Sequence, residues 1–137
     1  MEPDGVTCDG CPGTLHRFSI PPSIREWDAV SMDVATICDR CLRVAPATDP
    51  SDTGDAPAGI DGVHAAVPGG EAGVAMALLL GWLDSLTLNR AGIEVAITHL
   101  ESAGVDPLLV IERLLDDDAV SPAIDLERRL RQLQQRY

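Results

Sequence analysis

Two short segments, Cys8-Asp9-Gly10-Cys11 and Cys38-Asp39-Arg40-Cys41, decide how the first third of this chain folds. Each is a C-x-x-C motif, in which a tight turn directs two sulfurs toward one point. The intervening residues, 12–37, form a spacer somewhat longer than is usual between paired motifs of this kind. Four thiolates at tetrahedral angles suit zinc, which accepts sulfur ligands and has no d-electron preference for geometry. The spacing therefore predicts one structural Zn²⁺ bound by Cys8, Cys11, Cys38 and Cys41.

Other uses of the four cysteines stay open at this point. Iron in a rubredoxin-like site would need the same four sulfurs. Disulfides are disfavoured in a reducing cytoplasm, and a thioredoxin-type redox motif would need a βαβ context that the chain does not predict. Pro12 follows Cys11 and has no N–H to donate to a ligating sulfur, whereas Leu42 supplies one after Cys41. Because four thiolates close the coordination shell, a metal here is expected to be structural rather than catalytic.

Residues 1–45 predict a zinc ribbon, in which a short β-hairpin carries the two cysteine turns. Residues 15–20 and 33–37 have strand-like composition, and Pro21 and Pro22 end the first run because proline cannot donate to a ladder. A helical turn is expected within residues 23–28. A segment of this size has too little core to fold alone, so bound metal would supply the missing stability.

The rest of the chain divides into a linker and a helical domain. Residues 46–70 are rich in Pro, Gly and Asp, which predicts a flexible linker in which His64 is solvated. Residues 71–137 show helical periodicity broken by capping residues, and an antiparallel bundle of three to four helices is the economical packing. The predicted helices cover about 71–86, Asn89 to Gly104, Asp106-Pro107 to about residue 116, and Ser121-Pro122 to the end, the last with a stripe of Leu126, Leu130, Leu133 and Tyr137. The fold class is thus α+β.

The charge balance is unusual, with 22 acidic residues against 10 basic ones and a formal net charge of −12. Every basic residue is Arg, and Asp is commoner than Glu. Acidic surfaces of this kind keep a protein soluble rather than attract a particular partner. The start of the chain is acidic and its longest apolar run, residues 73–83, is about half the ~20 residues that a membrane span needs. We therefore expect a soluble, cytoplasmic protein with no membrane association.

Several other polar residues are candidates for a site but have simpler explanations. His16 is expected to be a surface or strand-face residue, since four thiolates already complete a metal site. His99 is expected on a helix surface, because no Cys, Ser or second His stands at a spacing that would pair with it. Residues 116–118, three consecutive Asp, lack the alternating ligands of a calcium loop and predict a solvated helix end. The last helix is locally basic and suggests a nucleic-acid stripe, although complementing the helix dipole is the favoured interpretation; its four cations are Arg128, Arg129, Arg131 and Arg136.

Several segments together resemble an uncharacterised family of small haloarchaeal zinc-ribbon proteins. The segments are the two C-x-x-C motifs with residues 18–21 and 37–46, and in the helical part residues 83–86, 103–109 and 125–129. The resemblance covers most of the chain except the linker. It implies that the four cysteines are the ligands and that the source is a halophilic archaeon, in which an acidic, lysine-free composition is usual. The resemblance implies no activity.

These observations predict a non-enzymatic module that binds a protein partner or a second copy of itself. The nearly all-apolar helix over residues 72–83 is expected to lie either centrally or at such an interface. A nucleic-acid-binding regulator using the ribbon and the last helix is the alternative, although high salt would weaken its phosphate contacts. A redox or metal-handling role for the cysteines ranks third.

Overall fold

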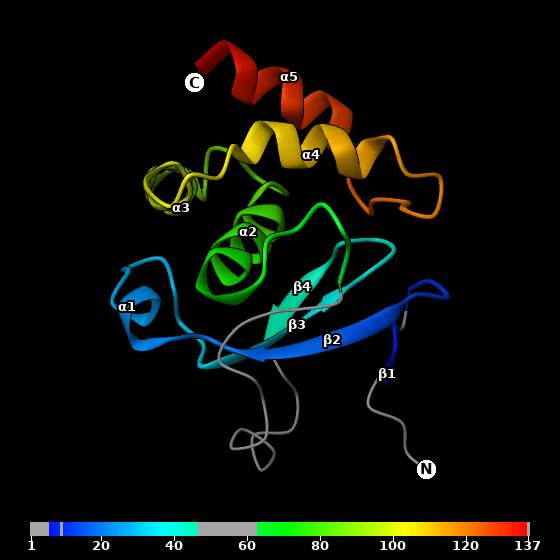
Figure 1. Cartoon of the computed structure of the whole chain (residues 1–137), viewed down its shortest axis with the longest axis horizontal. Helices are drawn as coiled ribbons and strands as arrows, with labels where there is room; N and C mark the ends of the chain where they lie inside the picture. Colours follow the sequence, from blue (N-terminus) through cyan, green and yellow to red (C-terminus); the bar gives the residue numbers. More distant parts are fainter. Residues whose placement is uncertain (1–5, 9, 47–62, 137) are drawn as a thin grey trace.

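The computed structural model describes residues 6–8, 10–46 and 63–136, and its elements form three layers (Figure 1). A four-stranded antiparallel sheet forms one layer, helix α2 lies across it, and the remaining C-terminal helices cover α2 from the other side. The predicted α+β class is confirmed. The elements in chain order are β1 (Val6–Thr7), β2 (Thr14–Ser19), α1 (Pro22–Arg25), β3 (Val34–Cys38), β4 (Val44–Pro46), α2 (Gly70–Trp82), α3 (Arg90–Ser102), α4 (Pro107–Leu115) and α5 (Leu126–Arg136).

The predicted hairpin is confirmed as β2 and β3, which are the central strands in the order β1-β2-β3-β4. Leu15 pairs with Cys38 and Phe18 with Ala35, so the register carries the second cysteine turn to the end of the sheet where the first one lies. Phe18 is fully buried on one face, as the alternation of side chains along a strand requires. The helical turn expected within residues 23–28 is α1, which begins at Pro22 and ends already at Arg25.

Helix α2 is the centre of the molecule. All residues from Gly73 to Leu80 are buried, so the interpretation of this helix as central is confirmed and it offers no apolar face to a partner. Close approach to the sheet depends on Gly81, because a Cβ there would lie 2.8 Å from Cβ of Val44 in β4. On the other side, a Cβ on Gly92 of α3 would meet the ring of Trp82 at 3.0 Å. Small residues therefore set how closely the layers pack.

One hydrophobic core joins the sheet to the helices. It includes Phe18 and Ile37 from the sheet, Leu79 from α2, Leu100 from α3 and Leu133 from α5. The division into a ribbon (1–45), a linker (46–70) and a helical domain (71–137) stays a prediction, since a shared core does not show which part folds alone.

The described end of the predicted linker is packed against this core. Residues 47–62 lie outside the described part of the chain, but Val63 is buried in the core. The side chain of His64 is only 15% exposed, so the prediction that it is solvated is wrong. His64 instead bonds to Asp117, which lies 53 residues further along the chain.

The predicted helix ends are partly confirmed. Asp106 caps α4, and its Oδ1 accepts the N–H groups of Leu108 and Leu109 at 3.1 and 3.2 Å. Asn89 precedes α3 as predicted, yet its side chain does not cap that helix. The Asn89 Nδ2 group donates to the carbonyl of Trp82 at 2.9 Å, which helps to end α2 at Trp82, four residues earlier than predicted.

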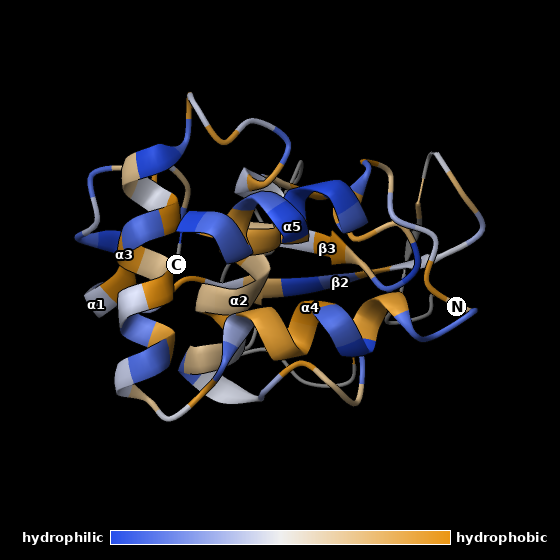
Figure 2. Cartoon of the chain, turned by 90° about the horizontal axis from the view of Figure 1, so that it is seen from above, coloured by the Kyte–Doolittle hydropathy of each residue, from blue (hydrophilic) through white to orange (hydrophobic). Residues whose placement is uncertain are grey.

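The predicted start of the last helix at Ser121-Pro122 is wrong. Helix α5 begins at Leu126, and Oδ1 of Asp125 accepts the N–H of Arg128 at 3.1 Å. The N–H of Ser121 is used elsewhere, because it donates to a carbonyl in the second cysteine turn. Leu126, Leu130 and Leu133 are buried as the stripe predicted, whereas Tyr137 lies outside the described residues. Hydrophilic residues follow the outer side of α5 (Figure 2).

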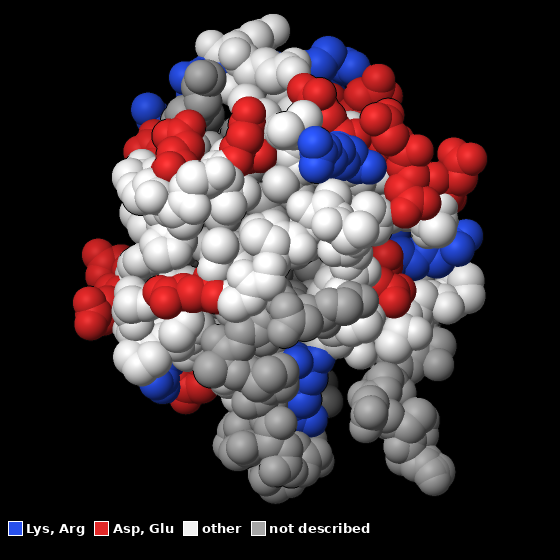
Figure 3. Space-filling model, viewed as in Figure 1, with Lys and Arg blue, Asp and Glu red and all other residues white. Residues whose placement is uncertain are grey.

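On the face shown in Figure 3, acidic side chains are spread widely and gather where α4 ends, at the upper right. No helix in the described part of the chain is both long and apolar enough to cross a bilayer.

Candidate metal centre

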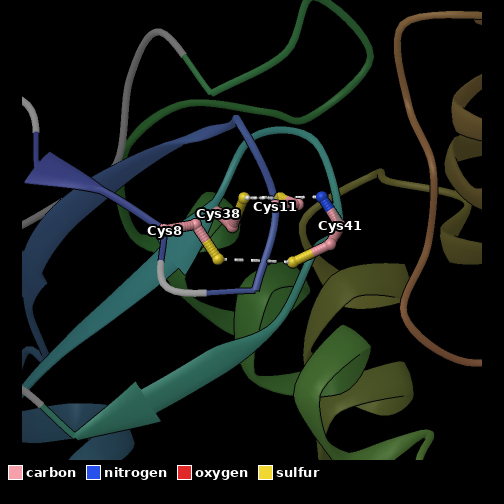
Figure 4. A group of neighbouring side chains, drawn as sticks. All are labelled: Cys8, Cys11, Cys38 and Cys41. Atoms are coloured by element: carbon pink, nitrogen blue, oxygen red, sulfur yellow. Dashed lines mark hydrogen bonds between the residues drawn. The ribbon is translucent and has the colours of Figure 1, made fainter.

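The four cysteine sulfurs converge at one end of the sheet. Cys8 follows β1 and Cys11 lies in the loop before β2, while Cys38 ends β3 and Cys41 lies in the turn before β4. Their sulfur atoms all lie within 4.8 Å of one another, and the side chains point toward a common centre (Figure 4). Cys8, Cys38 and Cys41 are buried, and Cys11 is half-buried. The arrangement can hold a metal ion.

Two of the sulfur separations are close to those around a tetrahedral ion. The Sγ atoms of Cys8 and Cys41 are 3.8 Å apart, and those of Cys11 and Cys38 are 3.5 Å apart. Four sulfurs at about 2.3 Å from a central ion would be separated from one another by about 3.8 Å. Disulfides need a sulfur separation of about 2.05 Å. All four cysteines are free, so the paired-disulfide alternative does not describe this site.

Backbone N–H groups hold the sulfurs in both turns, which we name the first knuckle (residues 8–13) and the second knuckle (residues 38–43). The N–H of Gly13 donates to Sγ of Cys11 at 3.4 Å, and the N–H groups of Arg40 and Cys41 donate to Sγ of Cys38 at the same distance. The concern raised by Pro12 is therefore unfounded, because the donor is two residues after Cys11 rather than one. Donation to sulfur favours its ionised form, the form that binds a metal.

Leu42 does not have the role that the sequence suggested. Its N–H donates to the carbonyl of Cys38 at 3.1 Å, rather than to a sulfur. Its backbone has a φ of +62°, a left-handed conformation that side chains other than Gly rarely adopt. Its side chain is only 5% exposed and belongs to the central core. Burial of this side chain thus holds the turn of the second knuckle in a conformation that it would not adopt alone.

Gly13 is required for the two knuckles to meet. A Cβ at this position would lie 2.5 Å from Sγ of Cys38 and 2.7 Å from Cβ of Arg40. Both distances are too short for nonbonded atoms, and neither neighbour is the far end of a flexible side chain. The first knuckle can therefore lie against the second only through a residue without a side chain.

The thiols differ in acidity because their surroundings differ. Burial raises the pKa of Cys41 to about 12, and burial also raises the pKa of Cys38. The Gly13 N–H lowers the pKa of Cys11 to about 7. At neutral pH, Cys38 and Cys41 keep their protons as free thiols. A cation held by all four sulfurs must displace those protons, so its charge replaces them in stabilising the thiolates.

His16 is placed beside this site but is not a ligand. Its Nε2 atom lies 3.0 Å from Oδ2 of Asp39, and Oδ1 of Asp39 accepts the N–H of Thr14 at 3.0 Å. Partial burial raises the pKa of Asp39, but the bonds from His16 and Thr14 outweigh it and the net effect is a lowered pKa. Asp39 is thus ionised and joins the second knuckle to β2. Sequence reasoning had not assigned this role to Asp39.

The second knuckle also bonds to the connection between α4 and α5. The N–H of Ser121 donates to the carbonyl of Arg40 at 2.7 Å, and the N–H of Ala123 donates to the carbonyl of Cys41 at 3.0 Å. No sequence signal indicates this contact, because it joins backbone groups about 80 positions apart. It brings the helical region onto the backbone of Cys41, a candidate metal ligand.

The other polar candidates take structural positions. In the described residues, no second group of three or more His, Cys, Asp and Glu side chains is arranged to hold a metal, and the acidic run 116–118 forms no such group. His99 lies against Trp27, with ring centroids 5.5 Å apart in an edge-to-face arrangement. Arg129 donates from Nε to the carbonyl of Leu83 at 2.8 Å and from Nη2 to the carbonyl of Asp84 at 3.2 Å. Arg129 of α5 is therefore bound to the backbone at the end of α2.

Comparisons with known proteins give a family but no activity. Neither a curated protein nor a solved structure matches the chain. A family model described as "Family of unknown function (DUF6276)" matches residues 7–137, and the chain belongs to this family.

Proposed function

We propose that this protein binds one zinc ion through Cys8, Cys11, Cys38 and Cys41, and that the ion is structural. The observation that carries the proposal is the convergence of four sulfurs within 4.8 Å, three of them on buried residues. Four protein ligands leave no open position for a substrate or an activated water. The ion would join the two knuckles and thereby fix the end of the sheet. Iron fits the same four sulfurs, so the test must separate the two ions.

We propose further that the protein acts without catalysis, as an interaction or adaptor module in a halophilic archaeon. The buried α2 cannot be the docking face, so the contact surface must lie on the outer helices. Leu88, in the turn before α3, and Val95, within α3, support this location because they are 85% and 41% exposed. A protein partner or a second copy of the chain would cover them.

Nucleic-acid binding is the outcome that would overturn this proposal. Nucleic acid would have to contact the basic residues of the last helix. Of these, Arg129 is bound to the end of α2, and Arg131 lies 3.8 Å from Glu127. A net charge of −12 also opposes approach to a phosphate backbone at moderate salt.

A halophilic origin is supported by composition, with 22 acidic residues, 10 basic ones and no lysine. At salt concentrations near saturation the Debye length is below about 3 Å, so the repulsion among surface carboxylates is screened. We expect the unfolding temperature to rise as KCl is increased to several molar. A stability that is unchanged or lowered by KCl would contradict a halophilic origin.

The deciding experiment measures metal content by inductively coupled plasma mass spectrometry, together with accessible thiols before and after chelation. One zinc per chain, with four thiols that react only after chelation, supports the structural site. Iron in its place would show as a visible thiolate-to-iron charge-transfer band. Light scattering in multimolar KCl then tests self-association, and fluorescence polarisation with random DNA at the same salt tests the nucleic-acid alternative. A metal-free protein with blocked thiols would contradict the proposal.

A further inference from the structure

One peptide group of the second knuckle connects a metal-binding sulfur to the helical region. The peptide between Arg40 and Cys41 donates its N–H to Sγ of Cys38 at 3.4 Å. The carbonyl of the same peptide accepts the N–H of Ser121 at 2.7 Å. Because a peptide group is planar and rigid, its orientation toward the sulfur also fixes where its carbonyl points.

The next peptide group repeats the arrangement. The peptide between Cys41 and Leu42 donates its N–H to the carbonyl of Cys38 at 3.1 Å, and its own carbonyl accepts the N–H of Ala123 at 3.0 Å. Two consecutive peptides therefore carry the geometry of the second knuckle to residues 121–123. The carbonyls of Arg40 and Cys41 are both oriented by Cys38, because its sulfur and its own carbonyl accept the N–H groups of these two peptides.

Packing around these two bonds is incomplete. A cavity of about 220 Å³ is lined by Cys41 and Leu42 of the knuckle, by Leu80 of α2, and by Pro122 and Ile124 of the connection. Water can occupy a space of this size, so side chains do not seal the contact between the knuckle and the connection. The two backbone hydrogen bonds are the direct polar links across it.

Residues 121–123 lead directly into α5, which depends on attachment. Helix α5 has 11 residues, fewer than an isolated helix needs to be stable in water. Leu126, Leu130 and Leu133 bury its apolar side, and Arg129 binds its first half to the end of α2. A change in the connection that precedes Leu126 would act on the first turn of this helix.

We infer that metal binding at the four cysteines controls the docking of the C-terminal segment, residues 119–136. This inference rests on the proposed metal site. With the ion bound, the sulfurs of Cys38 and Cys41 are held on one centre, so the knuckle carbonyls next to them stay aligned for Ser121 and Ala123. Without the ion no coordinate bond joins these two sulfurs to those of Cys8 and Cys11, and the knuckle peptides are free to turn away from the connection. The connection is then released, and α5 undocks while the core around α2 and α3 stays folded.

Linkage makes the inference testable in both directions, because a helix that docks only on the metal-bound form must also strengthen metal binding. The first test uses the unmodified chain, loaded with zinc or stripped by a chelator under reducing conditions. Hydrogen–deuterium exchange is followed by mass spectrometry. We expect chelation to speed exchange in residues 119–136 by tenfold or more, while α3 keeps most of its protection. Unchanged exchange in 119–136, or an equal loss of protection in α3, would overturn the inference.

The second test measures zinc affinity by competition with a chromophoric chelator. Arg129→Gln removes the bonds to the carbonyls of Leu83 and Asp84, which lie far from the cysteines in the chain. Arg128→Gln is the matched control, since it makes the same chemical change on an exposed neighbour. We expect zinc to bind Arg129→Gln about fivefold or more weakly than the control, the lower end of typical coupling between sites. Equal affinities would overturn the inference and leave the metal site intact. Failure of the unmodified chain to bind zinc would instead contradict the proposed function.

Discussion

His64 and Asp117 form a hydrogen-bonded pair with 2.7 Å between Nε2 and Oδ2, joining the segment before α2 to the end of α4. The N–H of Ala66 donates to Nδ1 of the same ring at 2.9 Å, so Nδ1 is the acceptor and Nε2 carries the proton in the neutral ring. A second N–H, from Ala119, donates to Oδ1 of Asp117 at 2.8 Å. The Ala119 bond, followed by the His64 bond, lowers the pKa of Asp117 below 3.8.

Asp117 should therefore stabilise the fold at neutral pH. A carboxyl group whose pKa is lower in the folded state contributes stability above its unfolded pKa, and this contribution is lost as the pH falls through the folded value. We expect Asp117→Asn to lower the urea midpoint at pH 7 and Asp118→Asn, its exposed neighbour, to leave it unchanged. Carboxyl NMR should place the pKa of Asp117 below 3.8. In His64→Gln it should rise only partway, because the Ala119 bond remains; an unchanged value would contradict the role given to His64.

Gly13 should tolerate no side chain. Gly13→Ala would place a Cβ 2.5 Å from Sγ of Cys38, so the two knuckles would have to separate. We expect this variant to lose tenfold or more in Co²⁺ affinity, of the order found when outer-shell partners of a metal site are changed. The visible spectrum of the bound ion reports the affinity. Gly10→Ala is the control, because its Cβ would lie 3.5 Å from the guanidinium of Arg43, an ordinary contact. Equal binding by both variants would show that the knuckles can move apart without cost.

Free zinc should raise thermal stability by an amount that grows with the logarithm of its concentration above the Kd. A ligand that binds only the folded state adds about 2.7 kcal/mol at a concentration 100-fold above its Kd. We expect the unfolding temperature to rise with buffered free zinc and to fall when a chelator is added. Cys38→Ser should lose this response, since it removes the most buried ligand, which is 0% exposed. A zinc response that persists in Cys38→Ser would show that the ion binds elsewhere.

Gly81 should control the distance between α2 and the sheet. Gly81→Ala would place a Cβ 2.8 Å from Cβ of Val44, and we expect overpacking to lower the free energy of unfolding by about 1–3 kcal/mol. Val44→Gly removes the opposing atom. The double variant should therefore lose less stability than the sum of the two single losses, because the clash is absent when both changes are made. Strictly additive losses in urea unfolding would contradict a clash at this position.

Much of the fold could be predicted because local chemistry agrees with tertiary structure. Two C-x-x-C turns converge as their spacing indicates, and the Asp106-Pro107 pair opens α4 as a cap followed by proline should. Helix α2 has apolar residues on nearly every side, which predicted either burial or an interface, and the structure shows burial.

Two of the failures share one cause, which is contact between distant segments. Ser121-Pro122 has the same local form as a helix start, yet the Ser121 N–H donates to Arg40, 81 positions earlier. His64 lies in a stretch rich in Gly and Pro, a composition that predicts a solvated side chain. Its partner Asp117 lies in the turn after α4. Neither pairing can be recognised from the spacing of residues in the sequence. Each forms only because the folded core brings two distant segments together.

The position of α2 over the sheet also has a consequence for synthesis on the ribosome. Chains emerge from the N-terminus, so both knuckles and all four strands are made before α2 begins at Gly70. The nascent ribbon must therefore wait, with Phe18 and Ile37 uncovered, until the helix that buries them has left the exit tunnel. Metal binding at this stage would hold the two knuckles of the uncovered hairpin together before α2 is made.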